Sequence, residues 1–127
     1  MMKTDMATKP LALLVEYDND LAEQCNAMLT SRGYRCSRVM NREEALTRLE
    51  LEAPDVLVID LGATVDVGAR DILQRLRTDK RLAAVKTVLF AENEESVGEY
   101  KGQVGAILYK PIPGPQLVEM VDKLMGK

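Results

Sequence analysis

The sequence contains no histidine. Without an imidazole, the chain cannot build a catalytic triad with a histidine base, a metal site with histidine ligands, or a phosphohistidine that donates a phosphoryl group. Cysteine is also scarce, with only Cys25 and Cys36 and no CxxC pair. We therefore expect two reduced thiols in the core of a cytoplasmic protein.

Long apolar runs and an excess of positive charge are absent as well. No apolar run approaches the roughly 20 residues that span a bilayer. The first ten residues, MMKTDMATKP, contain Asp5 and no apolar segment, which is not the pattern of a signal peptide. The formal net charge of −3 offers no general electrostatic surface to nucleic acid. We expect no direct contact with a membrane or with nucleic acid.

A chain of 127 residues fits one domain with one core. We expect residues 1–9 to be a flexible lead-in and residues 10–127 to form the domain. The sequence shows no internal repeat, no low-complexity tract and no linker, and it leaves no span for an appended DNA-binding domain.

Two unbroken apolar runs predict strands that are buried on both faces. One covers residues 11–15 (LALLV), and the other covers residues 56–59 and leads directly into Asp60. Strands without polar alternation are typical of the interior of a parallel sheet. Shorter segments predict three further strands at residues 34–39, 86–91 and 105–109.

Helical spacing and capping residues predict five helices between and after these strands. Asp20, followed by Glu23, predicts a helix start, and Asn41, followed by Glu44, predicts another. Pro115 suits the first turn of the last helix. The predicted helices cover residues 20–32, residues 41 to about 53, residues 69–78, a short acidic stretch at 92–103, and the segment after residue 115. Alternating strands and helices predict an α/β fold with a doubly wound parallel sheet and helices on both faces.

Three charged residues each follow an apolar strand: Glu16, Asp60 and Lys110. Because the carboxyl ends of parallel strands share one edge, we expect these side chains to converge there, together with Ala91. The two carboxylates repel each other unless a divalent cation or the lysine offsets them. A hard cation such as Mg²⁺ takes oxygen ligands and leaves room for phosphate, so Asp60 could attack a phosphoryl group while Lys110 neutralises its charge. Taken singly, each residue could instead be a solvated loop residue or a helix cap.

The sequence resembles the receiver domain of bacterial two-component response regulators over residues 9–124. The matching stretches are KPLALLVEYDND at 9–20, DVLVIDLGATVDVG at 55–68 and the pair Lys110-Pro111, whose peptide bond is usually cis in the family. Gly68 falls at the family's glycine eight residues after the acceptor aspartate. The resemblance implies a flavodoxin-like sheet with strand order 2-1-3-4-5.

The resemblance also implies a function. Asp60 would be the phosphoacceptor, taking a phosphoryl group from a histidine kinase or phosphotransfer protein, with Lys110 contacting that group. Glu16, Asp60 and the backbone carbonyl of Gly62 would hold Mg²⁺. Such a domain catalyses at most its own phosphorylation and dephosphorylation, and it signals to a downstream protein as a monomer or weak dimer.

Several positions depart from the family's pattern. Tyr17 stands where the direct metal ligand belongs, and a neutral phenol is a poor ligand for Mg²⁺. Ala91 replaces the switch Ser or Thr, and Ile107 replaces the switch aromatic residue. Glu92 adds negative charge beside the site, and Thr64 replaces the usual proline. The short spacing from Ala91 to the lysine predicts a trimmed fourth helix.

Two functions remain open from the sequence. The chain is either a phosphorylatable receiver or a pseudo-receiver, which keeps the fold and binds other proteins without phosphate. In the second case Asp60 and Lys110 form a structural ion pair. A third possibility, a flavin or nucleotide binder, needs a phosphate-cradling loop after the first strand. The acidic loop EYDND at residues 16–20 argues against it.

Overall fold

The protein is described by a computed structural model that covers residues 9–62 and 67–127. The predicted lead-in, apart from Lys9, and Thr64 lie outside the described residues. The domain boundary at residue 10 therefore stays a prediction.

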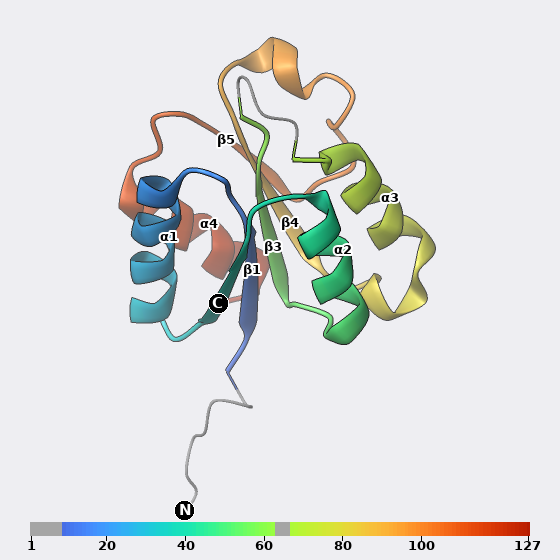
Figure 1. Cartoon of the computed structure of the whole chain (residues 1–127). Helices are drawn as coiled ribbons and strands as arrows, with labels where there is room; N and C mark the ends of the chain where they lie inside the picture. Colours follow the sequence, from blue (N-terminus) through green and yellow to red (C-terminus); the bar gives the residue numbers. More distant parts are fainter. Residues whose placement is uncertain (1–8, 63–66) are drawn as a thin grey trace, which may run out of the picture.

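The centre of the fold is a five-stranded parallel sheet with the order β2-β1-β3-β4-β5 (Figure 1). The predicted fold class and strand order are confirmed. β1 and β3 form from the unbroken apolar runs, and every residue of both strands is buried. The strands are β1 (Leu11–Val15), β2 (Arg35–Val39), β3 (Val56–Asp60), β4 (Lys86–Ala91) and β5 (Ala106–Tyr109).

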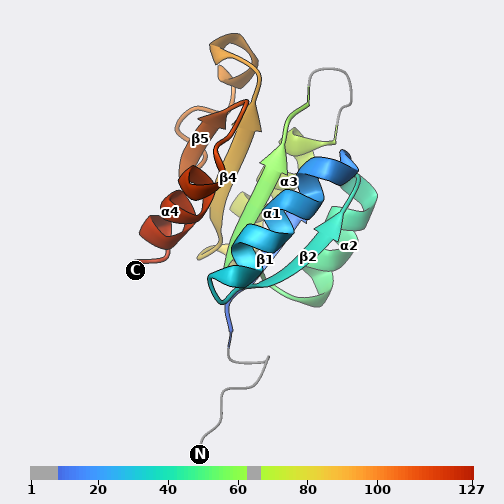
Figure 2. The same cartoon turned by 90° about the vertical axis from the view of Figure 1, so that its left-hand side faces the viewer.

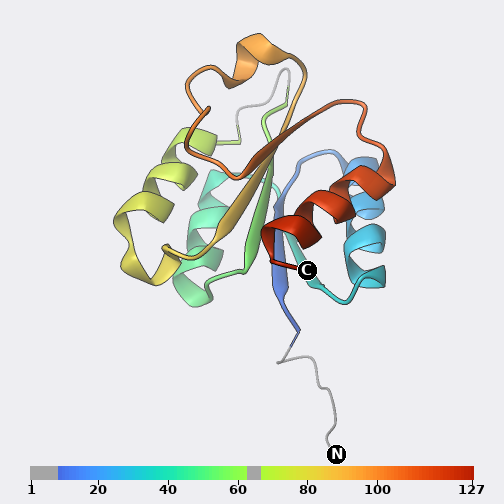
Figure 3. The same ribbon diagram turned by 180° about the vertical axis from the view of Figure 1, so that it is seen from behind.

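The helices cover both faces of the sheet. The apolar faces of α1 and α4 pack in one core cluster, and those of α2 and α3 pack in the cluster on the other face. Figures 2 and 3 show α1 and α4 together on the same side of the sheet. None of the described helices has both the length and the apolar character needed to cross a membrane. The helices are α1 (Asn19–Ser31), α2 (Arg42–Leu51), α3 (Ala69–Thr78) and α4 (Gly114–Leu124).

The prediction of a fifth helix at 92–103 is wrong. This stretch contains only the 3-10 helix η3 (Glu94–Val97), followed by turns, and the described residues hold four α-helices in all. The reason is local: Gly98 and Gly102 interrupt the stretch, and Gly102 takes a positive φ of 86°. Val97 nevertheless packs in the interior and is fully buried. A second 3-10 turn, η2 (Lys80–Leu82), follows α3.

Capping explains where the first two helices begin. The predicted start at Asp20 is wrong by two residues, because the side chain of Asp18 accepts the hydrogen bond from the Leu21 amide at 3.1 Å. The predicted cap of α2 is confirmed, since the Asn41 side chain accepts from the Glu44 amide at 2.9 Å. Asp18 and Asp20 can both cap a helix, and the sequence pattern alone does not show which of the two does so in α1.

The two cysteines are free. Cys25 is buried and Cys36 is half-buried. Burial raises the pKa of the Cys25 thiol to about 12 and that of Cys36 to about 11, so neither is a reactive thiolate at neutral pH.

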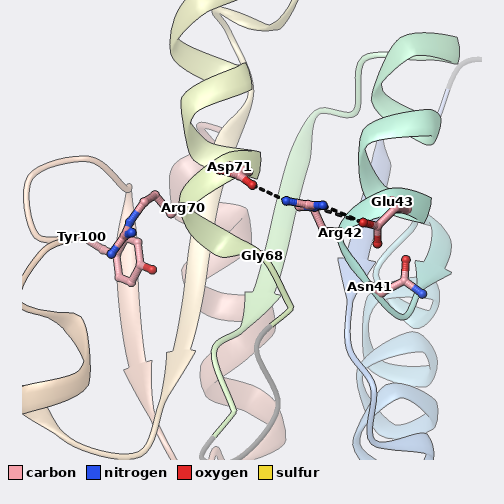
Figure 4. Close-up of a pocket in the computed structure, with 7 residues that line it drawn as sticks. All are labelled: Asn41, Arg42, Glu43, Gly68, Arg70, Asp71 and Tyr100. Atoms are coloured by element: carbon pink, nitrogen blue, oxygen red, sulfur yellow. Dashed lines mark hydrogen bonds and ion pairs between the residues drawn. The ribbon is translucent and has the colours of Figure 1, made fainter.

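Gly68 sets the approach of α3 to α2. It precedes α3 with a φ of 81°, a conformation that favours glycine. A Cβ at this position would lie 2.5 Å from the Cβ of Arg42. Figure 4 shows Gly68 opposite Arg42, which donates to Asp71 at the start of α3. The glycine is therefore required both by backbone conformation and by space.

Gly68→Ala should lower the free energy of unfolding by roughly 2 to 4 kcal/mol, from backbone strain together with the clash against Arg42. Gly33→Ala is the matched control, because Gly33 has a φ of 93° but nothing within 4 Å of an added Cβ. The control should lower the free energy of unfolding only through backbone strain, by about 1 kcal/mol. Urea unfolding measures both, and equal losses would show that the contact with Arg42 is unimportant.

Candidate functional site

The predicted convergence of charged residues is found at the carboxyl edge of the sheet. Lys110 Nζ lies 2.8 Å from Asp60 Oδ2, and the other oxygen of Asp60 accepts the Gly62 amide at 2.9 Å. The Asp60 side chain is only 4% exposed, and that of Lys110 is 23% exposed. The Lys110-Pro111 peptide bond is cis, as the resemblance implied. The pair joins β3 to the residue after β5, across the end of β4.

Glu16 is fully buried beside this pair. Its Oε2 accepts the Asp18 amide at 3.2 Å, whereas Oε1 is buried without a hydrogen-bond donor among the described residues. Burial and the neighbouring Asp60 carboxyl raise the pKa of Glu16 to about 8. Both effects favour the protonated form of Glu16 near neutral pH.

The backbone of Glu16 is held by β2. Its amide donates to Val39 O at 3.0 Å, and the Arg38 Nε donates to Glu16 O at 2.8 Å. Sequence reasoning missed Arg38. The only available signal was its place one residue before the end of the neighbouring strand, which becomes informative once the β1–β2 register is known.

Glu92 is the third carboxylate at the site. Its Oε2 lies 3.5 Å from Lys110 Nζ. Burial opposes the charge of Lys110, but the bond to Asp60 and the negative charges of Asp60, Glu16 and Glu92 outweigh that effect and raise the pKa of Lys110. The prediction that Glu92 lies beside the site is confirmed.

The donors expected for Mg²⁺ fit the ion poorly. The raised pKa of Glu16 disfavours the charged form that Mg²⁺ needs, and each oxygen of Asp60 already accepts one hydrogen bond. Tyr17 is 47% exposed, and the Asp18 carboxylate caps α1. No group of three or more potential acidic, cysteine or histidine ligands occurs in the part of the chain that the structure describes. The role of the Gly62 carbonyl stays a prediction.

The two switch positions lie in the core near the site. Ala91 is fully buried at the end of β4, and its methyl group offers no hydrogen bond. Ile107 is partly buried against the α2–α3 side of the sheet. The exposed Tyr109, two residues later, donates its hydroxyl to Glu94 at 3.2 Å. This aromatic contact was not predicted.

A separate pocket of about 360 Å³ lies near the first turns of α2 and α3 (Figure 4). Its two arginines are engaged with carboxylates, Arg42 with Glu43 and Asp71, and Arg70 with Glu99. The pocket is lined by none of the three residues predicted to converge. A second hollow, of about 390 Å³, adjoins Lys110 at the carboxyl edge of the sheet. It is lined by Leu21, Gln24, Glu92, Lys110, Pro111 and Ile112.

Solved structures with the same arrangement are response regulators and receiver domains. CheY4 of Vibrio cholerae superposes with a TM-score of 0.81 at 18% identity, covering 92% of this chain and 99% of that one. The receiver domain of a histidine kinase from Syntrophus aciditrophicus gives 0.80 at 22% identity, covering 92% and 90%. The chain has the receiver fold.

Sequence comparison adds distant relatives of this receiver-fold chain. No family model matches it. A Haloferax volcanii protein, whose name assigns it provisionally to the transcriptional regulators, is 27% identical over 94% of this chain. The chain spans only 20% of that protein's length. An uncharacterised 14.6 kDa protein of Leptolyngbya boryana is 26% identical over 87% of this chain and 86% of its own length.

The raised pKa of Glu16 predicts how stability depends on pH. Between the ordinary value of 4.5 and about 8, the folded protein keeps a proton that the unfolded chain has lost. The free energy of unfolding should therefore fall as pH rises from 5 to 8, by roughly 2 to 4 kcal/mol.

Glu16→Gln should remove this decline, because glutamine does not titrate. Glu23→Gln, at an exposed position of α1, should leave it unchanged. Urea unfolding at several pH values makes the comparison. A wild-type stability that is flat or rises between pH 5 and 8 would contradict the protonated state of Glu16.

Proposed function

We propose that this receiver-fold chain is a signalling module that binds partner proteins without phosphorylation of Asp60. The observation that carries the proposal is the internal neutralisation of the site. Lys110 contacts Asp60 at 2.8 Å, and the buried Glu16 favours its protonated form. A proton and a lysine thus offset the carboxylates of Glu16 and Asp60, the task that a divalent cation would otherwise perform.

Two positions support the same proposal. Tyr17 brings no carboxylate to the metal position, and Ala91 brings no hydroxyl to a phosphoryl group. Asp60 and Lys110 then act as a structural ion pair that fixes the ends of β3 and β5. We infer that the module works in the cytoplasm and that its partner is a protein. The hollow beside Lys110, between α1 and the segment before α4, offers a surface for that partner.

The alternative is a phosphoacceptor role for Asp60, and one contact favours it. The ammonium of Lys110 lies at hydrogen-bonding distance from Asp60, where it could offset the charge of a phosphoryl group. An oxygen of Asp60 would form the O–P bond as the P–N bond to a donor phosphohistidine breaks. Glu16, Asp60 and the Gly62 carbonyl would hold Mg²⁺, which supplies further neutralisation when bound.

Treatment with acetyl phosphate or beryllofluoride in millimolar Mg²⁺ separates the two functions. We expect no adduct by intact mass and no shift of the Asp60 NMR signals, because the metal site is incomplete. Asp60→Asn is the control for modification elsewhere. An adduct that forms on the folded wild-type protein and is lost in Asp60→Asn would overturn the proposal and establish the alternative.

Tyr17→Asp should raise the affinity for Mg²⁺ by roughly tenfold or more, because a carboxylate replaces a phenol at the expected ligand position. Tyr17→Phe is the matched control, since it removes the hydroxyl without adding charge, and should not change the affinity. Magnesium titration followed by NMR measures both. An unchanged affinity in Tyr17→Asp would mean that residue 17 does not face the metal position.

A further inference from the structure

Lys110 lies between two carboxylates that come from different parts of the chain. Asp60 ends β3, and Glu92 immediately follows β4. The distances from Lys110 Nζ are 2.8 Å to Asp60 Oδ2 and 3.5 Å to Glu92 Oε2. Glu92 is 43% exposed at its side chain, whereas Asp60 is 4% exposed, so Glu92 is the more accessible of the two carboxylates that contact the lysine.

This placement affects any anion that approaches from solvent. The attraction of a partly buried ammonium for an anion falls when a carboxylate already stands beside it, because the two negative charges repel. Glu92 also lines the hollow that adjoins Lys110. An anion that enters through this hollow therefore meets the carboxylate of Glu92 together with the ammonium.

Glu92 is also the first residue of the connection between β4 and β5. The Lys110 amide donates to Ala91 O at 2.9 Å, which holds the ends of the two strands together. The side-chain contact from Glu92 to Lys110 adds a second link at the same place. Further along the connection, Glu94 accepts from Lys101 at 2.9 Å and from Tyr109 at 3.2 Å. The connection is thus fixed by charged contacts at its start and over η3.

We propose that Glu92 is a built-in anionic partner of Lys110, which keeps phosphoryl-class anions out of the Asp60 site and fixes the start of the β4–β5 connection. The inference rests on the proposed function, since it names how the site is kept closed to phosphate. Glu92 is a positioning residue in this proposal, because it acts through Lys110.

The test compares Glu92→Gln with Glu95→Gln in the whole chain. Both substitutions remove one negative charge from the same segment, and Glu95 is an exposed residue of η3. One readout is the binding of beryllofluoride in the presence of Mg²⁺, followed by NMR. The other is hydrogen exchange of the η3 backbone amides, which reports on the connection and not on the anion.

Glu92→Gln should gain at least about threefold in affinity for beryllofluoride, so that it binds at a concentration at which Glu95→Gln and the wild-type protein show no binding. Its η3 amides should exchange roughly two- to fivefold faster than those of Glu95→Gln, the range for loss of a partly exposed ion pair. Both changes are required, and the absence of either in a folded variant overturns the inference. Beryllofluoride binding by the wild-type protein would overturn the proposed function instead. The difference between the two variants can still be read in that case.

Discussion

The ion pair between Lys110 and Asp60 is the interaction on which this end of the molecule depends. An unpaired carboxylate with 4% exposure would lose most of its hydration, and the lysine compensates for that loss at 2.8 Å. Asp60 ends β3 and Lys110 follows β5, and these two strands are not neighbours, since β4 lies between them. The pair therefore spans the end of β4, where the fully buried Ala91 keeps the intervening side chain small.

The remaining carboxyl groups adjust to this pair in different ways. Glu16 is fully buried and forms no ion pair with the residues that the structure describes, so its protonated form is favoured. Glu92 is more exposed and can stay charged near the lysine with the help of solvent. One ammonium thus serves the carboxylates of Asp60 and Glu92 while Glu16 favours its neutral form, which leaves one net negative charge at the site.

The sheet was predicted well from the sequence because each strand is marked by a short, continuous run of residues. Unbroken apolar runs placed β1 at its observed bounds and β3 to within one residue, and the spacing of apolar residues placed α3 at its observed bounds. The prediction failed at residues 92–103, where a short helix was expected. Val97 packs into the core from a 3-10 turn instead. The spacing of apolar residues indicates which side chains are buried, but it does not show that the backbone is helical. Two glycines in the segment, Gly98 and Gly102, disfavour a continuous helix.

The site was predictable only in part, for a related reason. Topology alone brings Glu16, Asp60 and Lys110 to one edge, so their convergence followed from strand order. Their protonation does not follow from it, because it depends on burial and on distances between side chains of separate strands. The apolar contacts of a core tolerate many substitutions of similar volume, whereas a buried charge depends on a few specific partners. The receiver fold can therefore persist while residues such as Tyr17 and Ala91 change which groups stand at the carboxyl edge of the sheet beside Asp60.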